Sequence, residues 1–194
     1  MSMRIKDEAK VTAISQAVFQ ITKQEGLNNA SISKIAKLAS VSPATVYIYY
    51  QDKSDMLSKI YLQVKELMDR GLAKKLQSET NVKAQIRAAM QHFASRFREY
   101  PDEAQFMRAI HSNPQFVTTE THQIADEIAK PLNDVIEYAI THKLLVTQNR
   151  DIIYAFFAGP LTYLLETRQV HDRVTTNEEI EELIEMVVQS LCAD

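Results

Sequence analysis

The twenty residues from Ser31 to Tyr50 read SISKIAKLASVSPATVYIYY, and this stretch decides the fold. In its first half, apolar residues recur at the spacing of an α-helix and predict a short helix over residues 32–39. Its inner face consists of Ile32, Ile35, Ala36 and Ala39. Ser31 precedes this helix, where a side-chain oxygen can accept a hydrogen bond from the free N–H groups of the first turn.

A second short helix is predicted directly after Ser42-Pro43. Serine is a favoured N-cap residue, and proline suits the first helical position because its missing N–H would have no partner there. Val46 and Tyr50 follow four residues apart, on one face of this helix. Two short helices joined by a brief turn, and preceded by a stabilising helix over residues 8–25, form a DNA-reading helix-turn-helix.

The outward residues of the second short helix suit contact with DNA. Ala44 and Thr45 are small enough for the helix to approach the floor of the major groove. Tyr47 and Tyr49 carry hydroxyls that suit phosphate contacts, which set register without reading sequence. Lys53 adds a phosphate-pairing charge at the start of the next helix.

The same helix contains no Arg, Asn or Gln, the residues that make bidentate contacts to bases. Direct readout must therefore come from other groups. The candidates are Thr45, Ala44, Ser33, Lys34 and an N-terminal arm that bears Arg4 and Lys6. Ile48 has no polar role, and we interpret it as a packing residue rather than as an apolar surface for a thymine methyl group. We expect phosphate contacts to dominate, with moderate sequence discrimination and steep salt dependence.

The rest of the chain repeats the helical pattern, so the expected fold class is all-α. Only three glycines are present, which leaves little room for β-hairpins. Pro101-Asp102-Glu103 predicts a helix start with a capping box. A continuous helix from Ser54 to about Gln77 would connect the two parts of the chain rigidly. Further helices are predicted over residues 82–99, 116–142, 149–169 and 177–191.

Charge supports a division into two domains. The net charge is −3, which by itself argues against a nucleic-acid binder. Residues 1–60, however, hold eight Lys and Arg against five Asp and Glu, while the remainder holds 14 against 20. A basic head on an acidic body fits DNA contact at one end. We assign a three-helix helix-turn-helix domain to residues 1–53 and a larger helical domain to residues 54–194, which starts with the connecting helix.

Several classes of activity and location are not expected. No GxxxxGK[ST], GxGxxG, HExxH or nucleophile–base motif occurs, so we expect neither an enzyme nor a catalytic site or cofactor. Cys192 is the single cysteine, a free thiol, and the histidines lack the spacing of a helical metal site. The first residues lack the apolar run of a signal peptide, and the patch at residues 155–165 is too short for a membrane span. We expect a cytoplasmic protein.

The N-terminal module closely resembles the tetracycline-repressor (TetR) family of bacterial regulators. The resemblance rests on Gly26-Leu27, Ser31-Ile32-Ser33-Lys34-Ile35-Ala36, Ala39-Ser40-Val41-Ser42, Thr45-Val46-Tyr47, Tyr49-Tyr50, Asp52-Lys53 and Leu57, all at the family's spacing. Position 40 departs from the usual glycine, which predicts local strain in the turn, and position 50 has tyrosine in place of phenylalanine. The predicted DNA-contacting residues are Ser31, Ser33, Lys34, Ser42, Pro43, Ala44, Thr45, Tyr47, Tyr49 and Lys53.

The remaining two-thirds of the chain resembles the family in architecture only. The resemblance implies a second domain that binds an apolar or aromatic small-molecule effector. Its pocket would be lined by His92, Phe93, Phe97, Phe106, Met107, Tyr138, Phe157 and Tyr163. The resemblance also implies that the last two long helices pair with their copies in a homodimer. The interface would contain Ile152, Phe156, Leu164, Ile184, Val187, Val188 and Leu191. For each of these residues the alternative is an ordinary intrachain core.

The function that these features favour is a sequence-specific DNA-binding transcription regulator. It would act as a repressor that leaves a palindromic double-stranded operator when it binds the effector. Two alternatives come from other classes of protein. A helical enzyme lacks any supporting motif, and a protein-interaction scaffold with a vestigial helix-turn-helix is disfavoured by the intact Tyr47, Tyr49 and Lys53.

Overall fold

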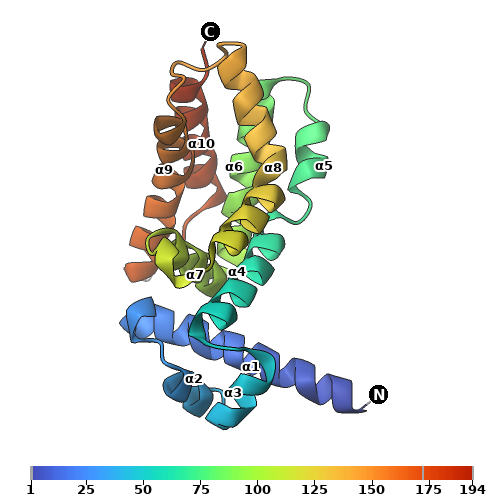
Figure 1. Cartoon of the computed structure of the whole chain (residues 1–194). Helices are drawn as coiled ribbons and strands as arrows, with labels where there is room; N and C mark the ends of the chain where they lie inside the picture. The colour runs from blue at the N-terminus through green and yellow to red at the C-terminus, as the bar shows by residue number, and fades with distance from the viewer. Residues whose placement is uncertain (1, 172, 194) are drawn as a thin grey trace. The chain divides into compact units, whose positions relative to one another are not determined.

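The computed structural model describes residues 2–171 and 173–193, with side chains from residue 8 onward. Within these ranges the chain folds into α-helices (Figure 1), as the sequence predicts. The described residues form no sheet, and the one strand-like pairing among them is an isolated antiparallel bridge between Leu145 and Cys192. None of the described helices has the long apolar run that a bilayer crossing needs.

The helices gather into two compact units that differ from the sequence-based division. The first unit contains the residues up to 68 together with 100–127, and the second contains 69–99 together with 128 onward. A middle segment of the chain therefore packs with the N-terminal helices. The boundary at residue 53 describes a division of function and stays a prediction.

The first unit is built around the helix-turn-helix. Its elements are α1 (Ser2–Glu25), the 3₁₀ turn η1 (Leu27–Asn29), α2 (Ile32–Leu38), α3 (Pro43–Tyr49), α4 (Lys53–Asp69), α7 (Pro101–His111), the 3₁₀ turn η2 (Pro114–Phe116) and the start of α8 (Thr119–Thr141). α1 packs against both α2 and α7. The Phe19 and Phe106 rings meet with centroids 5.3 Å apart. The core also contains Ile14, Ile35, Val46, Leu57 and Ile110, all fully buried.

The predicted continuous connecting helix is wrong. α4 ends at Asp69, and Gly71 follows in the left-handed conformation with φ 88°. α5 (Leu72–Gln77) starts only after that glycine. Glycine adopts positive φ without a steric penalty from a Cβ, so a single glycine inside an otherwise helical pattern is enough to separate two helices. The break lies directly after the boundary between the two compact units.

The second unit has the helix ends that the sequence predicts most accurately. It contains α5, α6 (Val82–Glu99), the later part of α8, α9 (Arg150–Val170) and α10 (Asn177–Leu191). α10 packs against α6 and α9. Thr176 and Glu179 form a reciprocal capping box at the start of α10, which fixes that end of the helix.

Two helix starts differ from their predictions, one in its cap and the other in its position. α7 begins at Pro101 without a side-chain cap, and Asp102 instead forms an ion pair with Lys23 of α1 at 2.7 Å. α8 begins at Thr119 rather than at residue 116. The Thr118 hydroxyl accepts a hydrogen bond from the Thr121 N–H at 3.2 Å, and so caps the helix where it starts.

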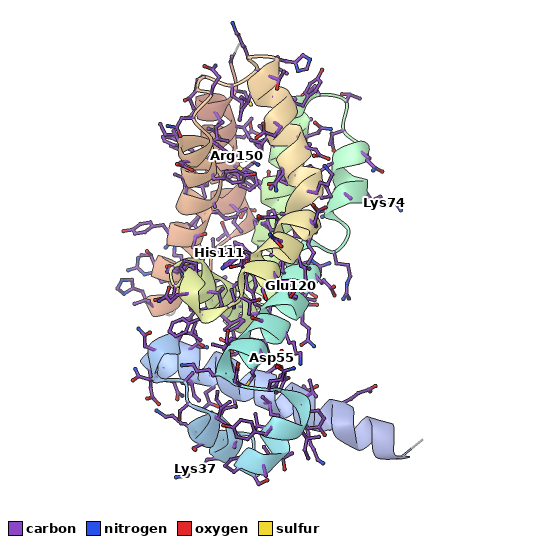
Figure 2. All side chains as sticks on the ribbon, viewed as in Figure 1. Lys37, Asp55, Lys74, His111, Glu120 and Arg150 are labelled. Atoms are coloured by element: carbon purple, nitrogen blue, oxygen red, sulfur yellow. The ribbon has the colours of Figure 1, made fainter. Side chains whose placement is uncertain are left out.

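His111 lies at the C-terminal end of α7 in the first unit, where its side chain is open to solvent on one side and hydrogen-bonded to Tyr61 on the other. Its Nε2 lies 2.9 Å from the hydroxyl of Tyr61, and Figure 2 marks it on α7. Burial lowers the pKa of His111 below its ordinary value of 6.5, and the charges of Lys65 and His122 lower the pKa further. The native state therefore favours the neutral imidazole.

Replacing this histidine should flatten the pH dependence of stability. Because the folded pKa is depressed, the unfolded chain takes up the proton first as pH falls. The stability that neutral His111 contributes is present above pH 6.5 and is lost as pH falls through the folded pKa. We expect the melting temperature of the wild type to fall more steeply between about pH 7 and about pH 5 than that of His111→Gln.

Glutamine is chosen because it can still hydrogen-bond the Tyr61 hydroxyl without titrating. His171, at the end of α9, offers a matched control because it lies outside the Tyr61–His111 contact, and His171→Gln should follow the wild-type curve. Parallel curves for the wild type and His111→Gln would show that His111 does not cause the dependence.

Candidate nucleic-acid interface

Two serine caps set the positions of α2 and α3. The Ser31 hydroxyl accepts a hydrogen bond from the Lys34 N–H at 3.3 Å, and the Ser42 hydroxyl accepts one from the Thr45 N–H at 3.0 Å. Pro43 occupies the first turn of α3. Both predicted caps are confirmed, and each satisfies an N–H group that has no partner inside its helix.

The turn between the two helices is a Schellman motif with serine at its left-handed position. Ser40 has φ 56°, the Val41 N–H donates to the Ala36 carbonyl at 2.9 Å, and the Ser40 N–H donates to the Lys37 carbonyl at 3.2 Å. This position normally takes glycine, since a Cβ is unfavourable at positive φ. Ser40 therefore has the positive φ at which local strain is predicted, and the strain itself stays a prediction.

Two buried side chains hold α3 against the rest of the first unit. Val46 is fully buried and Tyr50 is 4% exposed, as predicted. Burial, with a smaller effect from the Asp55 charge, raises the pKa of Tyr50, while a hydrogen bond with the Ser15 side chain opposes the shift. The Ser15 hydroxyl in turn donates to the Val11 carbonyl at 3.1 Å. Ser15 therefore supplies the polar partner that a tyrosine needs at this buried position.

The opposite face of α3 is open to solvent. Ala44 is exposed, and Tyr47 is 56% exposed. Thr45 is half-buried, and its hydroxyl is already hydrogen-bonded to the Ser42 hydroxyl at 2.9 Å. Ile48 is 74% exposed, so its interpretation as a packing residue is wrong. The error arose because a large aliphatic side chain in a short helix usually belongs to the core.

The two lysines of the predicted interface already have partners within the chain. Lys34 forms an ion pair with Glu25. The Lys53 ammonium lies over the Phe116 ring, 4.9 Å from its centroid, and burial lowers the pKa of Lys53. The Ser54 hydroxyl donates to the Phe116 carbonyl at 3.3 Å. Phe116 thus positions the start of α4, a role that local sequence could not indicate because the partners are 62 residues or more apart.

Other basic groups frame this surface. Lys37 is exposed on α2, where Figure 2 labels it. The side chains of Arg4 and Lys6, proposed as an N-terminal arm, lie outside the described residues. Two further predicted contacts are exposed: Ser33 on α2 and Pro43 on α3. Tyr49 is half-buried, with its ring centroid 6.4 Å from that of Tyr50.

Four of the eight predicted effector-binding residues gather in the second unit. The Phe93 ring lies 5.4 Å from that of His92, 6.0 Å from that of Phe97 and 6.2 Å from that of Phe157, between centroids. His92 is 2% exposed. These four residues form a contiguous aromatic cluster on α6 and α9.

The other four residues lie elsewhere. Phe106 and Met107 are buried in the first unit, where Phe106 packs on Phe19. Tyr138 is 54% exposed and stacks on His142, and Tyr163 is 74% exposed. A groove of about 540 Å³ in the first unit and another of about 480 Å³ in the second have none of the eight residues in their lining. No described residues form a cluster of His, Cys, Asp or Glu able to hold a metal ion.

The predicted dimer interface divides into exposed and buried residues. On α9, Ile152 and Phe156 are 46% and 48% exposed, and Leu164 is half-buried. On α10 the predicted interface residues are buried in the unit's own core. These are Ile184, Val187, Val188 and Leu191. Their assignment to the dimer interface is corrected. They belong to the intrachain core, because α10 packs this apolar face against α6 and α9 of the same chain.

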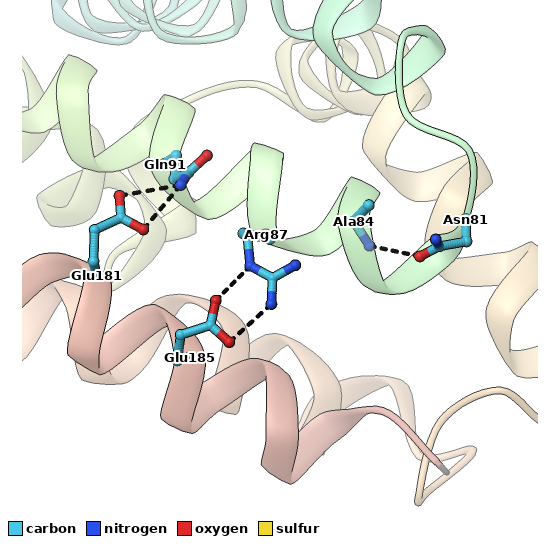
Figure 3. A network of polar contacts seen from close by, with 6 residues as sticks. All are labelled: Asn81, Ala84, Arg87, Gln91, Glu181 and Glu185. Carbon is cyan, nitrogen blue, oxygen red and sulfur yellow. Dashed lines mark hydrogen bonds and ion pairs between the residues drawn. The ribbon is translucent and has the colours of Figure 1, made fainter.

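A polar network joins α10 to α6 beside that core (Figure 3). Arg87 makes two parallel hydrogen bonds to the Glu185 carboxylate, at 2.5 and 2.8 Å. The Gln91 amide donates to both oxygens of Glu181, at 3.0 and 2.9 Å. The hydrogen bonds from Arg87 lower the pKa of Glu185. The acidic run of α10 is therefore partly engaged in holding two helices together.

Comparisons with known proteins agree with this geometry. Residues 15–60 match the family model of bacterial regulatory proteins of the tetR family. The chain is 33% identical over 63 residues to the HTH-type transcriptional regulator AcrR of Shigella flexneri, and this match spans 31% of the chain and 29% of that protein.

Two solved structures share the fold over nearly the whole chain. A TetR family transcription regulator from Marinobacter aquaeolei VT8 superimposes with a TM-score of 0.85 at 21% identity, over 98% of this chain and 100% of that one. The TetR-like regulator LfrR from Mycobacterium smegmatis, solved in complex with proflavine, has a TM-score of 0.62 at 16% identity, over 94% and 96% of the two chains.

The capped α2–α3 pair with its exposed second helix defines a protein of the helix-turn-helix class. The family match includes that whole motif, and the likeness of fold continues through the helices that come after it. The segment 15–60 is therefore similar to the DNA-binding module of the tetR family of bacterial regulatory proteins, and the whole chain shares the fold of solved regulators of that family.

Replacing Ser40 with glycine should stabilise the protein. The change removes the penalty of a Cβ at positive φ, partly offset by the greater freedom of glycine in the unfolded chain. We expect the melting temperature to rise by about 1–3 °C in a thermal unfolding experiment.

Ser33→Gly is the matched control, because Ser33 lies inside α2 with helical neighbours on both sides. There glycine should lower the melting temperature. A Ser40→Gly variant that unfolds at or below the wild-type temperature would contradict the assignment of strain to this turn.

Proposed function

We propose that this protein is a DNA-binding transcription regulator, a homodimeric repressor that a small-molecule effector releases from a palindromic operator. The observation that carries the proposal is the open face of α3, held by two serine caps and two buried anchors inside a module that matches the TetR family model. A helix presented in this way is built to enter the major groove.

The proposed DNA contacts surround α3. The residues are Ser31, Ser33, Lys34, Ser42, Pro43, Ala44, Thr45, Tyr47, Tyr49 and Lys53. The Tyr47 hydroxyl and the Lys53 ammonium suit phosphate oxygens on the DNA backbone. Lys53 would exchange the face of the Phe116 ring for a phosphate, a stronger partner for an ammonium ion. The residues up to 60 carry a basic balance that favours this approach.

The proposed homodimer would use the exposed face of α9. Ile152, Phe156 and Tyr163 are all large and exposed, at helical spacing. Gly159 lies between them, and a Cβ at this position would meet no atom of the chain within 4 Å. Nothing in the protomer itself therefore requires glycine here, whereas a closely approaching second helix would. Two recognition helices related by a twofold axis fit a palindromic operator.

The proposed effector is a flat aromatic compound. The rings of His92, Phe93, Phe97 and Phe157 pack on one another, and a flat aromatic ligand that entered between them would replace these contacts with similar ones. LfrR, which shares the fold, was solved in complex with proflavine. α8 is the helix that continues from the first compact unit into the second without a break, and it is our candidate for carrying the effector's signal.

DNA binding should be steeply salt-dependent, and Lys53 should account for part of that dependence. In a titration by fluorescence anisotropy, we expect log K to fall steeply and linearly with log salt for the wild type. Lys53→Gln should reduce the slope by about 0.9 for each protomer, because one phosphate contact is lost in each DNA-binding head.

Lys74→Gln is the matched control, since Lys74 is an exposed lysine of the second unit and should leave the slope unchanged. A slope near zero for the wild type would contradict the phosphate-dominated interface. Failure of the folded dimer to bind DNA even at low salt would favour the interaction scaffold instead.

A charge on the exposed face of α9 should dissociate the dimer. Phe156→Glu would bury a carboxylate without a partner in the proposed interface. We expect light scattering coupled to gel filtration to give the mass of a monomer, with the helical circular dichroism spectrum retained.

Val174→Glu is the matched control, because Val174 is 82% exposed and lies outside the α9 face. This variant should remain a dimer. A dimeric Phe156→Glu protein would exclude this face as the interface.

A further inference from the structure

Ile48 is an aliphatic side chain that the fold does not use. It is 74% exposed, whereas Val46 on the same short helix is fully buried and anchors α3. An isoleucine in water forgoes the favourable free energy of burying its apolar surface, about 25 cal/mol for each Å². Single exposed apolar residues are common on protein surfaces, but Ile48 lies in the middle of the α3 face proposed to meet DNA, which makes a contact outside the protomer the natural use of its side chain.

Ala44 extends this apolar surface. It is exposed and precedes Ile48 by four residues, which places the two side chains one above the other on the same side of the helix. Together Ala44 and Ile48 form an apolar stripe along the outer face of α3. Tyr47 lies beside the stripe with its hydroxyl available for backbone contacts.

The side chains that could hydrogen-bond to bases are few. α3 has the sequence PATVYIY and contains no charged or amide side chain. One hydrogen bond of the Thr45 hydroxyl is already made to Ser42, and Lys34 is paired with Glu25. Hydrogen-bond readout by α3 is therefore weak, and the stripe is the largest feature that it can offer to base edges.

Only one group on the major-groove edge of DNA is apolar, the C5-methyl group of thymine. We infer that Ile48, supported by Ala44, reads sequence by packing against thymine methyl groups. The inference rests on the proposed DNA-binding function and deepens it, because it assigns base discrimination to an apolar contact. The operator half-site should then contain thymine at the position that faces Ile48, and phosphate contacts from neighbouring residues should fix the register.

The experiment compares DNA with and without this methyl group. A pool of random duplexes is enriched by binding to the wild-type dimer, and the selected duplexes are resynthesised with deoxyuridine in place of thymidine. Uracil keeps the Watson–Crick pairing with adenine and lacks the C5-methyl group. We expect the uracil duplexes to bind roughly tenfold more weakly, since an apolar contact is lost in each of the two half-sites.

Two variants identify the side chain responsible. Ile48→Ala should bind thymine and uracil duplexes equally, and its own selected pool should lose the thymine preference at the affected position. Tyr47→Phe is the matched control: it should bind both duplexes more weakly through loss of a phosphate contact while keeping the ratio between them.

The outcomes separate this inference from the proposed function. Equal wild-type binding to thymine and uracil duplexes would overturn methyl readout and leave DNA binding intact. If Ile48→Ala still prefers thymine duplexes to uracil duplexes, another group or the shape of the DNA causes the preference, and the inference is overturned. A folded dimer that enriches no DNA would overturn both the inference and the proposed function.

Discussion

The structure of the proposed interface depends on the need to hold a helix of seven residues in place. Isolated helices of this length are not stable in water, so α3 exists only because its surroundings fix it. Ser42 caps one end, Val46 and Tyr50 are buried on its inner side, and the strained turn at Ser40 sets its direction. Because these residues supply the stabilisation, the outer face needs no role in folding. It is free to present residues chosen for contact with DNA.

This division of roles extends to a segment distant in sequence. Residues 100–127 belong to the same compact unit as the N-terminal helices, and Phe116 meets Lys53 while its carbonyl accepts from Ser54. Ser58 likewise accepts a hydrogen bond from the Thr118 N–H just before α8 begins. The start of α4 is thus fastened to the start of α8 at several points. A displacement of α8 would reach Lys53 through these contacts, without the uninterrupted connecting helix that Gly71 rules out.

The features that sequence predicted well are those governed by neighbouring residues. The caps at Ser31 and Ser42 involve partners three residues away, and the ends of α6 and α10 are set by a local pattern. The faces of α10 show why other features could not be predicted. Ile184 and Val188 form an apolar stripe that suits either an intrachain core or a dimer interface, and only packing against α6 and α9 decides between them. The Phe116–Lys53 contact joins residues too far apart for any spacing rule.

Affinity and discrimination at this surface have different physical sources. In the proposed complex, lysines and tyrosine hydroxyls at its edge would contact phosphates, and their contribution would weaken at high salt because the release of condensed counterions then gains less free energy. The exposed Ile48 would act through apolar contact, which moderate salt scarcely alters. Rising ionic strength should therefore weaken binding to every sequence while the ratio between thymine-containing and other sites persists. In this arrangement, the residues that would bind the phosphates are separate from the residue that would distinguish one base sequence from another. A recognition helix without charged or amide groups could therefore still select among sequences.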